Sequence, residues 1–285
     1  MKKLPSWRRS PVAVFLFPIF LFSVLPATAH PDPAHSLAEL DKHLAETPDD
    51  AMLHLRRAEL LLRRNHPDTA RPSVVRALAL SPDDPEIVLI SVRLAHAEGN
   101  LPHALVQAEE ATRRFPGFPP AWKWLARLRK ESGDGNAAIA AKLRHVSFKD
   151  AVDPGDFLTA AAWIRERNQE GDSLLALSTL DQAVAVFGPI VALQQAAIPL
   201  EISLSRHEQA LARVAALVKK YGPSASSSLL RADIHEAVGR HAEAAAACDS
   251  AIAMLDASAA GNDDPLTAIR EKILARKAEN LSKVR

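Results

Sequence analysis

The chain has 285 residues, of which 48% are hydrophobic and 24% charged, and its 35 basic side chains nearly balance its 34 acidic ones. This balance excludes the strongly basic, aromatic-rich composition that is typical of nucleic-acid-binding proteins, so we predict no nucleic-acid partner. Cys248 is the only cysteine, which excludes an intramolecular disulfide. We therefore expect a protein whose stability comes from apolar packing.

Residues 1-29 are predicted to be a secretory signal peptide. Four basic residues precede the apolar run Val12–Leu25, and the small-residue site Ala27-Thr28-Ala29 follows it. The alternative is an uncleaved membrane anchor, but this run of 14 residues contains Pro18, and a spanning helix needs about 20 residues. We expect an exported protein, periplasmic or secreted after cleavage near Ala29, with no stable membrane insertion. Removing the segment leaves 31 basic and 34 acidic residues, a net charge of −3.

Residues 30-50 are predicted to form a polar lead and an N-terminal capping helix. Leu37, Leu40 and Leu44 recur with helical spacing before Pro48. By its phase relative to the segments that follow, this is a lone second helix, which would cover the exposed end of the first repeat.

The chain from residue 51 to residue 255 repeats itself with a period of about 34 residues. Each unit contains two segments with helix-period apolar residues, separated by a polar break. Three markers recur from unit to unit: a proline at Pro48, Pro82 and Pro116; a turn residue at Gly99, Gly133, Gly171, Ser205 and Gly239; and an alanine at Ala70, Ala104, Ala138, Ala176, Ala210 and Ala244. Small residues let helices of neighbouring hairpins approach closely. The period predicts an all-α fold of six stacked helical hairpins.

The third unit resembles the consensus of the tetratricopeptide repeat family. It contains Trp122, the pair Leu125-Ala126, the turn Gly133-Asp134 and the small residue Ala138. The resemblance implies a right-handed superhelical solenoid of about six helix-turn-helix repeats. Repeats 1-3 would occupy 51-146, an insertion loop 147-156, and repeats 4-6 157-255. His145 in place of a small residue and Pro199 inside a first helix depart from the pattern.

Residues 256-285 are predicted to form a linker and a C-terminal capping helix. The segment 258-263 has the composition of a linker. After it, Leu266, Ile269, Ile273 and Leu274 are predicted to form one apolar face, with basic residues around the rest. We interpret this helix as a cap on the last repeat, and the alternative is a basic helix that lies on a membrane surface.

No motif for catalysis or cofactor binding is found. The eleven histidines lack zinc-binding spacing, and the chain has neither a glycine-rich phosphate loop nor a nucleophile elbow. We predict no catalytic residue, no cofactor and no metal site, and hence no enzyme. Weak metal sites at His30 with His35, or at His235 with His241, are the alternative to scattered surface histidines. Cys248 is predicted to be a small buried residue rather than a reactive thiol.

The resemblance places the binding surface on the concave side, which the first helices line. The positions that it transfers to this sequence are Leu55, Glu59, Leu62, Arg63, Leu89, Arg93, His96, Lys123, Arg127, Lys130, Arg165 and Asn168. Five of them form a basic ladder, our candidate partner-binding groove: Arg93, Lys123, Arg127, Lys130 and Arg165. Residues 51–149 contain 16 basic and 10 acidic side chains. We hypothesise that this groove receives an acidic segment or a C-terminal carboxylate; alternatively, these side chains only solvate the surface.

Two further features bear on the groove. The two-carboxylate clamp of chaperone-binding members is absent, since the corresponding positions are Leu55, Glu59, Ile90, Pro120 and Trp124. Trp122 and Trp124 point about 200° apart on one helix. We expect Trp122 to pack in the core, whereas Trp124 either packs against the adjacent unit or lies exposed as a ligand anchor.

The sequence thus favours a non-catalytic scaffold or adaptor that binds a partner protein or peptide. One alternative is a carrier of a small ligand or metal. Another is an accessory subunit that modulates an exported enzyme.

Overall fold

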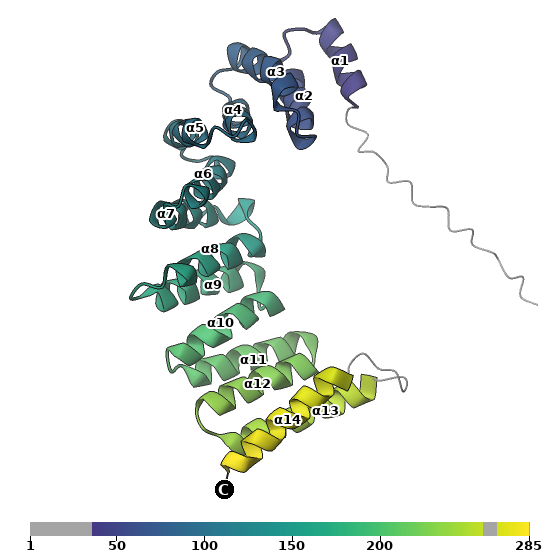
Figure 1. Cartoon of the computed structure of the whole chain (residues 1–285), viewed down its shortest axis with the longest axis vertical. Coiled ribbons are helices and arrows are strands. Elements are labelled where there is room, and N and C mark those ends of the chain that lie inside the picture. The colour runs from purple at the N-terminus through teal and green to yellow at the C-terminus, as the bar shows by residue number, and fades with distance from the viewer. Residues whose placement is uncertain (1–35, 259–266, 285) are drawn as a thin grey trace, which may run out of the picture.

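The computed structural model describes residues 36–258 and 267–284, which form an elongated, curved stack of helices (Figure 1). These residues contain fourteen α-helices, one 3-10 helix and no strand. In chain order they are α1 (Leu37–Glu46), α2 (Ala51–Arg63), α3 (Pro67–Leu80), α4 (Pro85–Ala97), α5 (Leu101–Arg114), α6 (Pro119–Glu131), α7 (Gly135–Val146), η1 (Lys149–Ala151), α8 (Pro154–Arg167), α9 (Asp172–Phe187), α10 (Val191–Ser203), α11 (His207–Tyr221), α12 (Ala225–Ala237), α13 (His241–Ser258) and α14 (Thr267–Lys283).

The helices from α2 to α13 pair in sequence to give six hairpins, each stacked on the next. Helices α2, α4 and α6, the first helices of their hairpins, lie on the inner side of the arc in Figure 1. The predicted all-α solenoid is confirmed. Pro199 lies inside α10, which continues to Ser203.

The turn of every hairpin contains a residue with a positive φ angle. These residues are Asn65, Gly99, Gly133, Gly171, Ser205 and Gly239, with φ between 58° and 84°, and the fourth turn contains a second one, Asn168, with φ 54°. A left-handed residue ends the first helix and reverses the chain, and glycine adopts this conformation without steric cost. Five turns share one geometry, whereas in the fourth Asn168 ends α8 and Gly171 immediately precedes α9.

The recurring alanines are the points of closest approach between helices. The six that open the second helices are completely buried, with 0% exposure: Ala70, Ala104, Ala138, Ala176, Ala210 and Ala244. Cys248, one turn after Ala244, is also completely buried, as predicted for a small apolar residue. Burial raises the pKa of its thiol. A larger side chain at these positions would push the helices apart.

The core is distributed along the stack rather than gathered at one centre. One cluster joins the first two hairpins through Leu55, Val74 and Ile90. Another runs from α7 to α10 and includes Phe157 and Leu180. Each hairpin therefore buries its apolar surface against its neighbours, as in other repeat proteins.

The junction between the third and fourth hairpins differs from the predicted loop. Helix α8 begins at Pro154, inside the segment 147-156 that we assigned to an insertion loop. The Asp153 carboxylate caps this helix by accepting from the Asp156 backbone N–H at 3.1 Å. Pro154 occupies the first turn, where a missing N–H costs nothing. The predicted loop was too long because Asp153 and Pro154 were not recognised as the N-cap and first turn of a helix.

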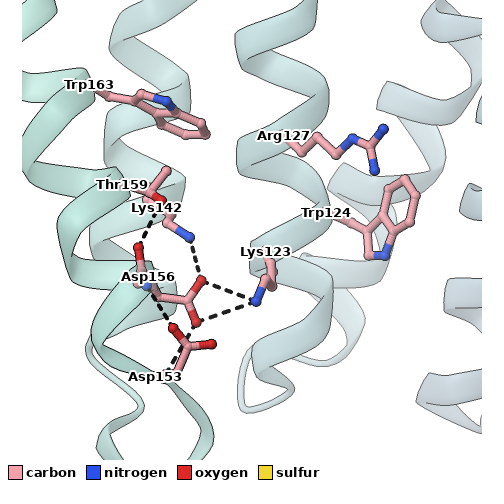
Figure 2. A pocket seen from close by; sticks show the side chains of 9 residues that line it. Lys123, Trp124, Arg127, Lys142, Asp153, Asp156, Thr159 and Trp163 are labelled. Atoms are coloured by element: carbon pink, nitrogen blue, oxygen red, sulfur yellow. Dashed lines mark hydrogen bonds and ion pairs between the residues drawn. The ribbon is translucent and has the colours of Figure 1, made fainter. Parts of the chain in front are cut away.

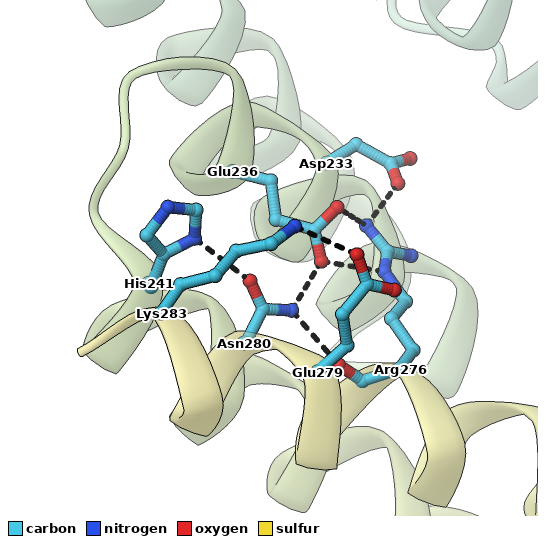
Figure 3. Close-up of polar contacts among 7 residues, drawn as sticks. All are labelled: Asp233, Glu236, His241, Arg276, Glu279, Asn280 and Lys283. Atoms are coloured by element: carbon cyan, nitrogen blue, oxygen red, sulfur yellow. Dashed lines mark hydrogen bonds and ion pairs between the residues drawn. The ribbon is translucent and has the colours of Figure 1, made fainter. Parts of the chain in front are cut away.

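The C-terminal helix does not present the apolar face that we predicted. Ile273 is buried against α13, but Ile269 and Leu274 are each 45% exposed, and Leu266 lies outside the described residues. The side that contacts the preceding helices instead includes buried Asn280 and half-buried Arg276 (Figure 3). The Arg276 guanidinium reaches back to α12, where it donates to Glu236 at 2.8 Å and to Asp233 at 2.5 Å. A polar network therefore sets the orientation of α14.

Candidate functional site

A pocket of about 540 Å³ opens between the first helices of the third and fourth hairpins, α6 and α8 (Figure 2). Helix α7 contributes one lining residue, Lys142. The lining residues are Lys123, Trp124, Arg127, Lys142, Asp153, Gly155, Asp156, Thr159 and Trp163. This volume lies within the range of ligand-binding pockets in proteins.

Two half-buried tryptophans form walls of the pocket. Trp124 comes from α6, and the Arg127 guanidinium carbon lies 5.0 Å from its ring centroid. Trp163 comes from α8, with the Lys130 Nζ 5.6 Å from its ring centroid. Trp124 packs against the adjacent unit, with its ring centroid 5.5 Å from that of His96 on α4, and its remaining surface lines the pocket. Trp122 is also only half-buried and donates its indole N–H to the Pro116 carbonyl at 3.0 Å.

A buried ion cluster forms the floor of the pocket. The Asp156 carboxylate accepts from Lys142 Nζ at 2.7 Å and lies 3.1 Å from Lys123 Nζ. The side chains of Lys142 and Asp156 are each 6% exposed. Burial alone would raise the pKa of Asp156, but the hydrogen bonds from Lys142 and Lys123 outweigh it and hold this pKa far below its usual range. The floor therefore contains a carboxylate that stays ionised and fully partnered.

His145 lies beneath this floor, where the repeat pattern favours a small residue. Its Nδ1 is 3.2 Å from the Pro119 carbonyl oxygen, and its Nε2 is 3.3 Å from Asp156 Oδ2 without the alignment of a hydrogen bond. Both neighbours are acceptors, so a neutral imidazole satisfies only one of them. Burial lowers the pKa of His145 more than the Asp156 carboxylate raises it. The ring is therefore uncharged at neutral pH.

The predicted basic ladder is largely paired with acidic side chains. Four of its five cations have a partner: Arg93 with Glu59 at 2.7 Å, Lys123 with Asp156 at 3.1 Å, Arg127 with Glu131 at 2.8 Å and Lys130 with Glu166 at 2.7 Å. Arg165 is exposed and has no ion pair among the described residues. The ladder is thus an alternation of charges, rather than an uncompensated basic strip.

The structure brings some of the predicted groove residues together and separates others. Lys123 and Arg127 line the pocket, and Lys130 adjoins it through Trp163. Arg93 and Arg165 are not among the lining residues. Two further positions transferred from the family, Leu55 and Leu89, are buried in the core and were wrong as groove positions. Their side chains turn toward the second helices, where apolar packing stabilises them.

Sequence reasoning missed the lining residues that come from α7 and α8. Trp163 was not considered as a site residue, and Asp156 was assigned to the predicted insertion loop 147-156. The available signal was the sequence Asp153-Pro154-Gly155-Asp156, in which an acidic cap, a proline and an acid three residues later mark the start of a helix. Read in this way, it would have placed Thr159 and Trp163 on the same helix.

The alternative metal sites receive no support from the described residues. His241 Nδ1 lies 3.0 Å from the Asn280 side-chain oxygen, and burial lowers the pKa of His235. No group of three histidine, cysteine or acidic residues in residues 36–258 and 267–284 is placed to hold a metal ion. His30, His35 and the predicted signal peptide lie outside the described part of the chain. Within that part, no helix combines the length and the apolar character needed to cross a membrane.

Six helical hairpins, which stack through buried alanines and each reverse at a turn with a left-handed residue, define an α-solenoid repeat protein. A family model described as "Tetratricopeptide repeat" matches residues 55–117 and 196–265. The chain therefore contains tetratricopeptide repeats, in agreement with the resemblance found in its sequence. Members of this family generally act as non-catalytic scaffolds for protein–protein interaction.

Solved structures share this fold at low sequence identity. The C-terminal part of a TPR repeat-containing protein from Cytophaga hutchinsonii is 13% identical, with a TM-score of 0.56, over 76% of this chain and 88% of that chain. Yeast Tom70 is 15% identical, with a TM-score of 0.50, and the match covers 74% of this chain but 42% of Tom70. Among curated proteins, no match is found.

Proposed function

We propose that this protein is a non-catalytic scaffold that binds a segment of a partner protein in the pocket between α6 and α8. The observation that supports this best is the composition of the pocket, where two tryptophan walls stand beside partly exposed cations. Aromatic and arginine side chains in concave sites are the residues that most often dominate protein–protein binding. Helices α2, α4 and α6, which lie on the inner side of the arc, provide a surface for an extended segment that leads to the pocket.

The cations at the pocket retain hydrogen-bonding capacity for an anionic group. Arg127 uses its Nε for Glu131, and its two terminal nitrogens donate no hydrogen bond to the described residues. Lys123 lies beside only one carboxylate, Asp156, and its side chain is 53% exposed. A partner carboxylate placed between them would form charge-assisted hydrogen bonds. The groove thus favours a segment with an acidic group.

The site of action that we propose is outside the cytosol, periplasmic or secreted. The basic residues, the apolar run and the small-residue site of residues 1-29 support export. Mass spectrometry of the protein purified from its native cell tests this. We expect a chain that begins at His30, and an intact N-terminus would contradict export by cleavage.

Binding to the groove is tested by affinity capture with two charge-matched triple variants. The groove variant replaces Arg127, Lys130 and Arg165 with Glu, and leaves Lys123 in place because its reversal would set a second carboxylate beside buried Asp156. The control variant replaces Arg113, Lys149 and Lys219 with Glu, all exposed and outside the pocket lining.

We expect the parent and the control variant to retain the same partner and the groove variant to lose it. Equal retention by all three proteins would contradict binding at the groove. The identity of the retained partner then decides between an assembly factor and an accessory subunit of an exported enzyme.

A further inference from the structure

The pocket between α6 and α8 has features that specify its ligand more closely than the rest of the groove. We propose that it binds one large apolar side chain together with a single adjacent carboxylate of the partner segment. This inference rests on the proposed function of the same surface. A segment with a run of acidic residues along the whole groove would be a different ligand, and the ion pairs of the ladder disfavour it.

The apolar part of the ligand is specified by the two tryptophans. Trp124 and Trp163 are both half-buried, so part of each ring remains open to the pocket. Figure 2 shows Trp163 on α8, with Thr159 between its ring and the ion cluster, and Trp124 beside Arg127 on the side of α6 away from Trp163. Large apolar side chains gain most from contact with such rings, because stacking adds to the burial of apolar area. An aromatic side chain is the expected occupant.

The sign of the charged part follows from which polar groups already have partners. The Asp153 carboxylate caps α8, and Asp156 is held by Lys142 and Lys123. A ligand cation would find only Asp153 without a cation partner, and the lining cations Lys123, Arg127 and Lys142 outnumber the two carboxylates. A ligand anion would find Lys123 and Arg127, which lie one helical turn apart on α6 and whose side chains are 53% and 56% exposed.

The number of carboxylates follows from the neighbouring ion pairs. A run of acidic residues along the ladder would have to displace Glu59, Glu131 and Glu166 from their cations at 2.7 to 2.8 Å. Each displacement exchanges one ion pair for another and adds little affinity. One carboxylate at the pocket exchanges nothing, because the terminal nitrogens of Arg127 are available. The pocket therefore specifies one carboxylate in the partner segment, next to the apolar side chain.

Short peptides test this composition, with binding followed by the indole N–H signals of the tryptophans in NMR spectra of the isotope-labelled protein. The first peptide places phenylalanine next to aspartate within glycine and serine, with both ends blocked. The second replaces the phenylalanine with alanine, and the third replaces the aspartate with asparagine. The fourth has no aspartate but ends in phenylalanine with a free carboxylate. A fifth replaces the aspartate with lysine.

We expect the first or the fourth peptide, or both, to shift the Trp124 and Trp163 signals saturably at or below about 1 mM. The Trp122 signal, on the other side of α6, serves as the internal control and should not move. The alanine, asparagine and lysine peptides should bind at least about tenfold more weakly. Comparison of the first peptide with the fourth tells whether the carboxylate comes from a side chain or from a chain end.

A variant that fills the pocket tests the site without removal of the tryptophans, whose loss could impair folding. Thr159→Met places a longer side chain in the pocket and leaves both tryptophans intact, and it should weaken the best peptide at least about tenfold. The same substitution at Thr69, which is exposed on α3 and outside the pocket lining, should leave binding unchanged.

Three results would overturn the inference. If the alanine peptide binds as tightly as the phenylalanine peptide, the apolar subsite is refuted while an acid-binding groove stands. If the asparagine or lysine peptide binds as tightly, the anionic subsite is refuted. If none of the peptides shifts the pocket signals at 10 mM while the capture experiment still shows loss of a partner in the groove variant, this ligand class is refuted and the proposed function is retained.

Discussion

The buried pair Lys142–Asp156 makes the sharpest stability prediction, through the substitution Asp156→Asn. Both side chains are 6% exposed, so the substitution leaves a buried ammonium without its counterion. Breaking a buried ion pair by removing one partner costs about 3–5 kcal/mol. The amide oxygen of asparagine still accepts one hydrogen bond from Lys142, so we expect a loss of about 3 kcal/mol at neutral pH.

Urea unfolding followed by circular dichroism measures this loss. The matched control is Asp83→Asn, because Asp83 forms an ion pair with Arg114 at 2.7 Å but its side chain is 91% exposed. Exposed pairs contribute little, so the control should unfold nearly as the parent does. A loss below about 1 kcal/mol for Asp156→Asn would refute the assignment of this cluster as a buried structural pair.

The pH dependence gives an independent check on the same residue. The pKa of Asp156 in the folded protein lies below its value in the unfolded chain, about 3.9. Its contribution is therefore complete above about pH 5 and is lost as pH falls toward the lowered pKa of the folded state. The difference in stability between parent and Asp156→Asn should shrink below about pH 4. A difference that is constant from pH 7 to pH 3 would contradict an ionised Asp156.

Three further predictions concern the pH response, the turns and the hairpin contacts. The pKa of His145 is lowered in the folded state, so the unfolded chain takes up a proton first and stability falls as pH drops below about 6.5. His145→Ala should therefore flatten the pH dependence of urea unfolding between pH 7 and pH 5. An unchanged slope would contradict this assignment. Ser205 has a φ of 58°, so Ser205→Gly should raise the melting temperature. The backbone strain that glycine relieves exceeds the entropy that it adds to the unfolded chain, which gives a net gain of about 0.5 kcal/mol. A lower melting temperature would argue against strain at this residue. Ala138 has 0% exposure at a hairpin contact, so Ala138→Leu should cost about 1–3 kcal/mol in calorimetry, and a neutral result would show that the helices can separate freely.

The repeat frame was predictable from sequence because its causes are local and recur. Ala138 and its five equivalents must be small where helices touch, and the turn position must accept a positive φ. Residues with these properties recur at fixed spacing and are visible without a structure. The environment of Trp124 was not predictable, because packing against another unit and exposure to solvent both fit the same helical pattern.

The site was predicted only in part because its contacts cross between repeats. We identified Lys123 and Arg127, and Glu59 as a groove position, but not Glu131 and Glu166, and we did not predict that these carboxylates pair with the ladder. The signal was present in the spacing, since the pairs Glu59–Arg93 and Lys130–Glu166 are separated by 34 and 36 residues, about one repeat. Charges of opposite sign one period apart on first helices lie side by side.

The orientation of α14 could not be read from apolar periodicity. Ile269 and Leu274 match the helical pattern, yet both are exposed. The contact is determined by Arg276 and the carboxylates of Asp233 and Glu236 on α12, about 40 residues earlier in the chain. A prediction based on apolar residues alone gives no weight to such a network.

Site-specific photo-crosslinking in the native cell tests the central claim most directly. A photoreactive residue is introduced at Thr159, inside the pocket, or at Lys219, on the exposed side of α11. If the pocket holds a partner segment, the probe at position 159 forms one discrete protein adduct, and the probe at position 219 forms none of that mass. An adduct of the same mass from position 219, with none from position 159, would contradict binding in the pocket.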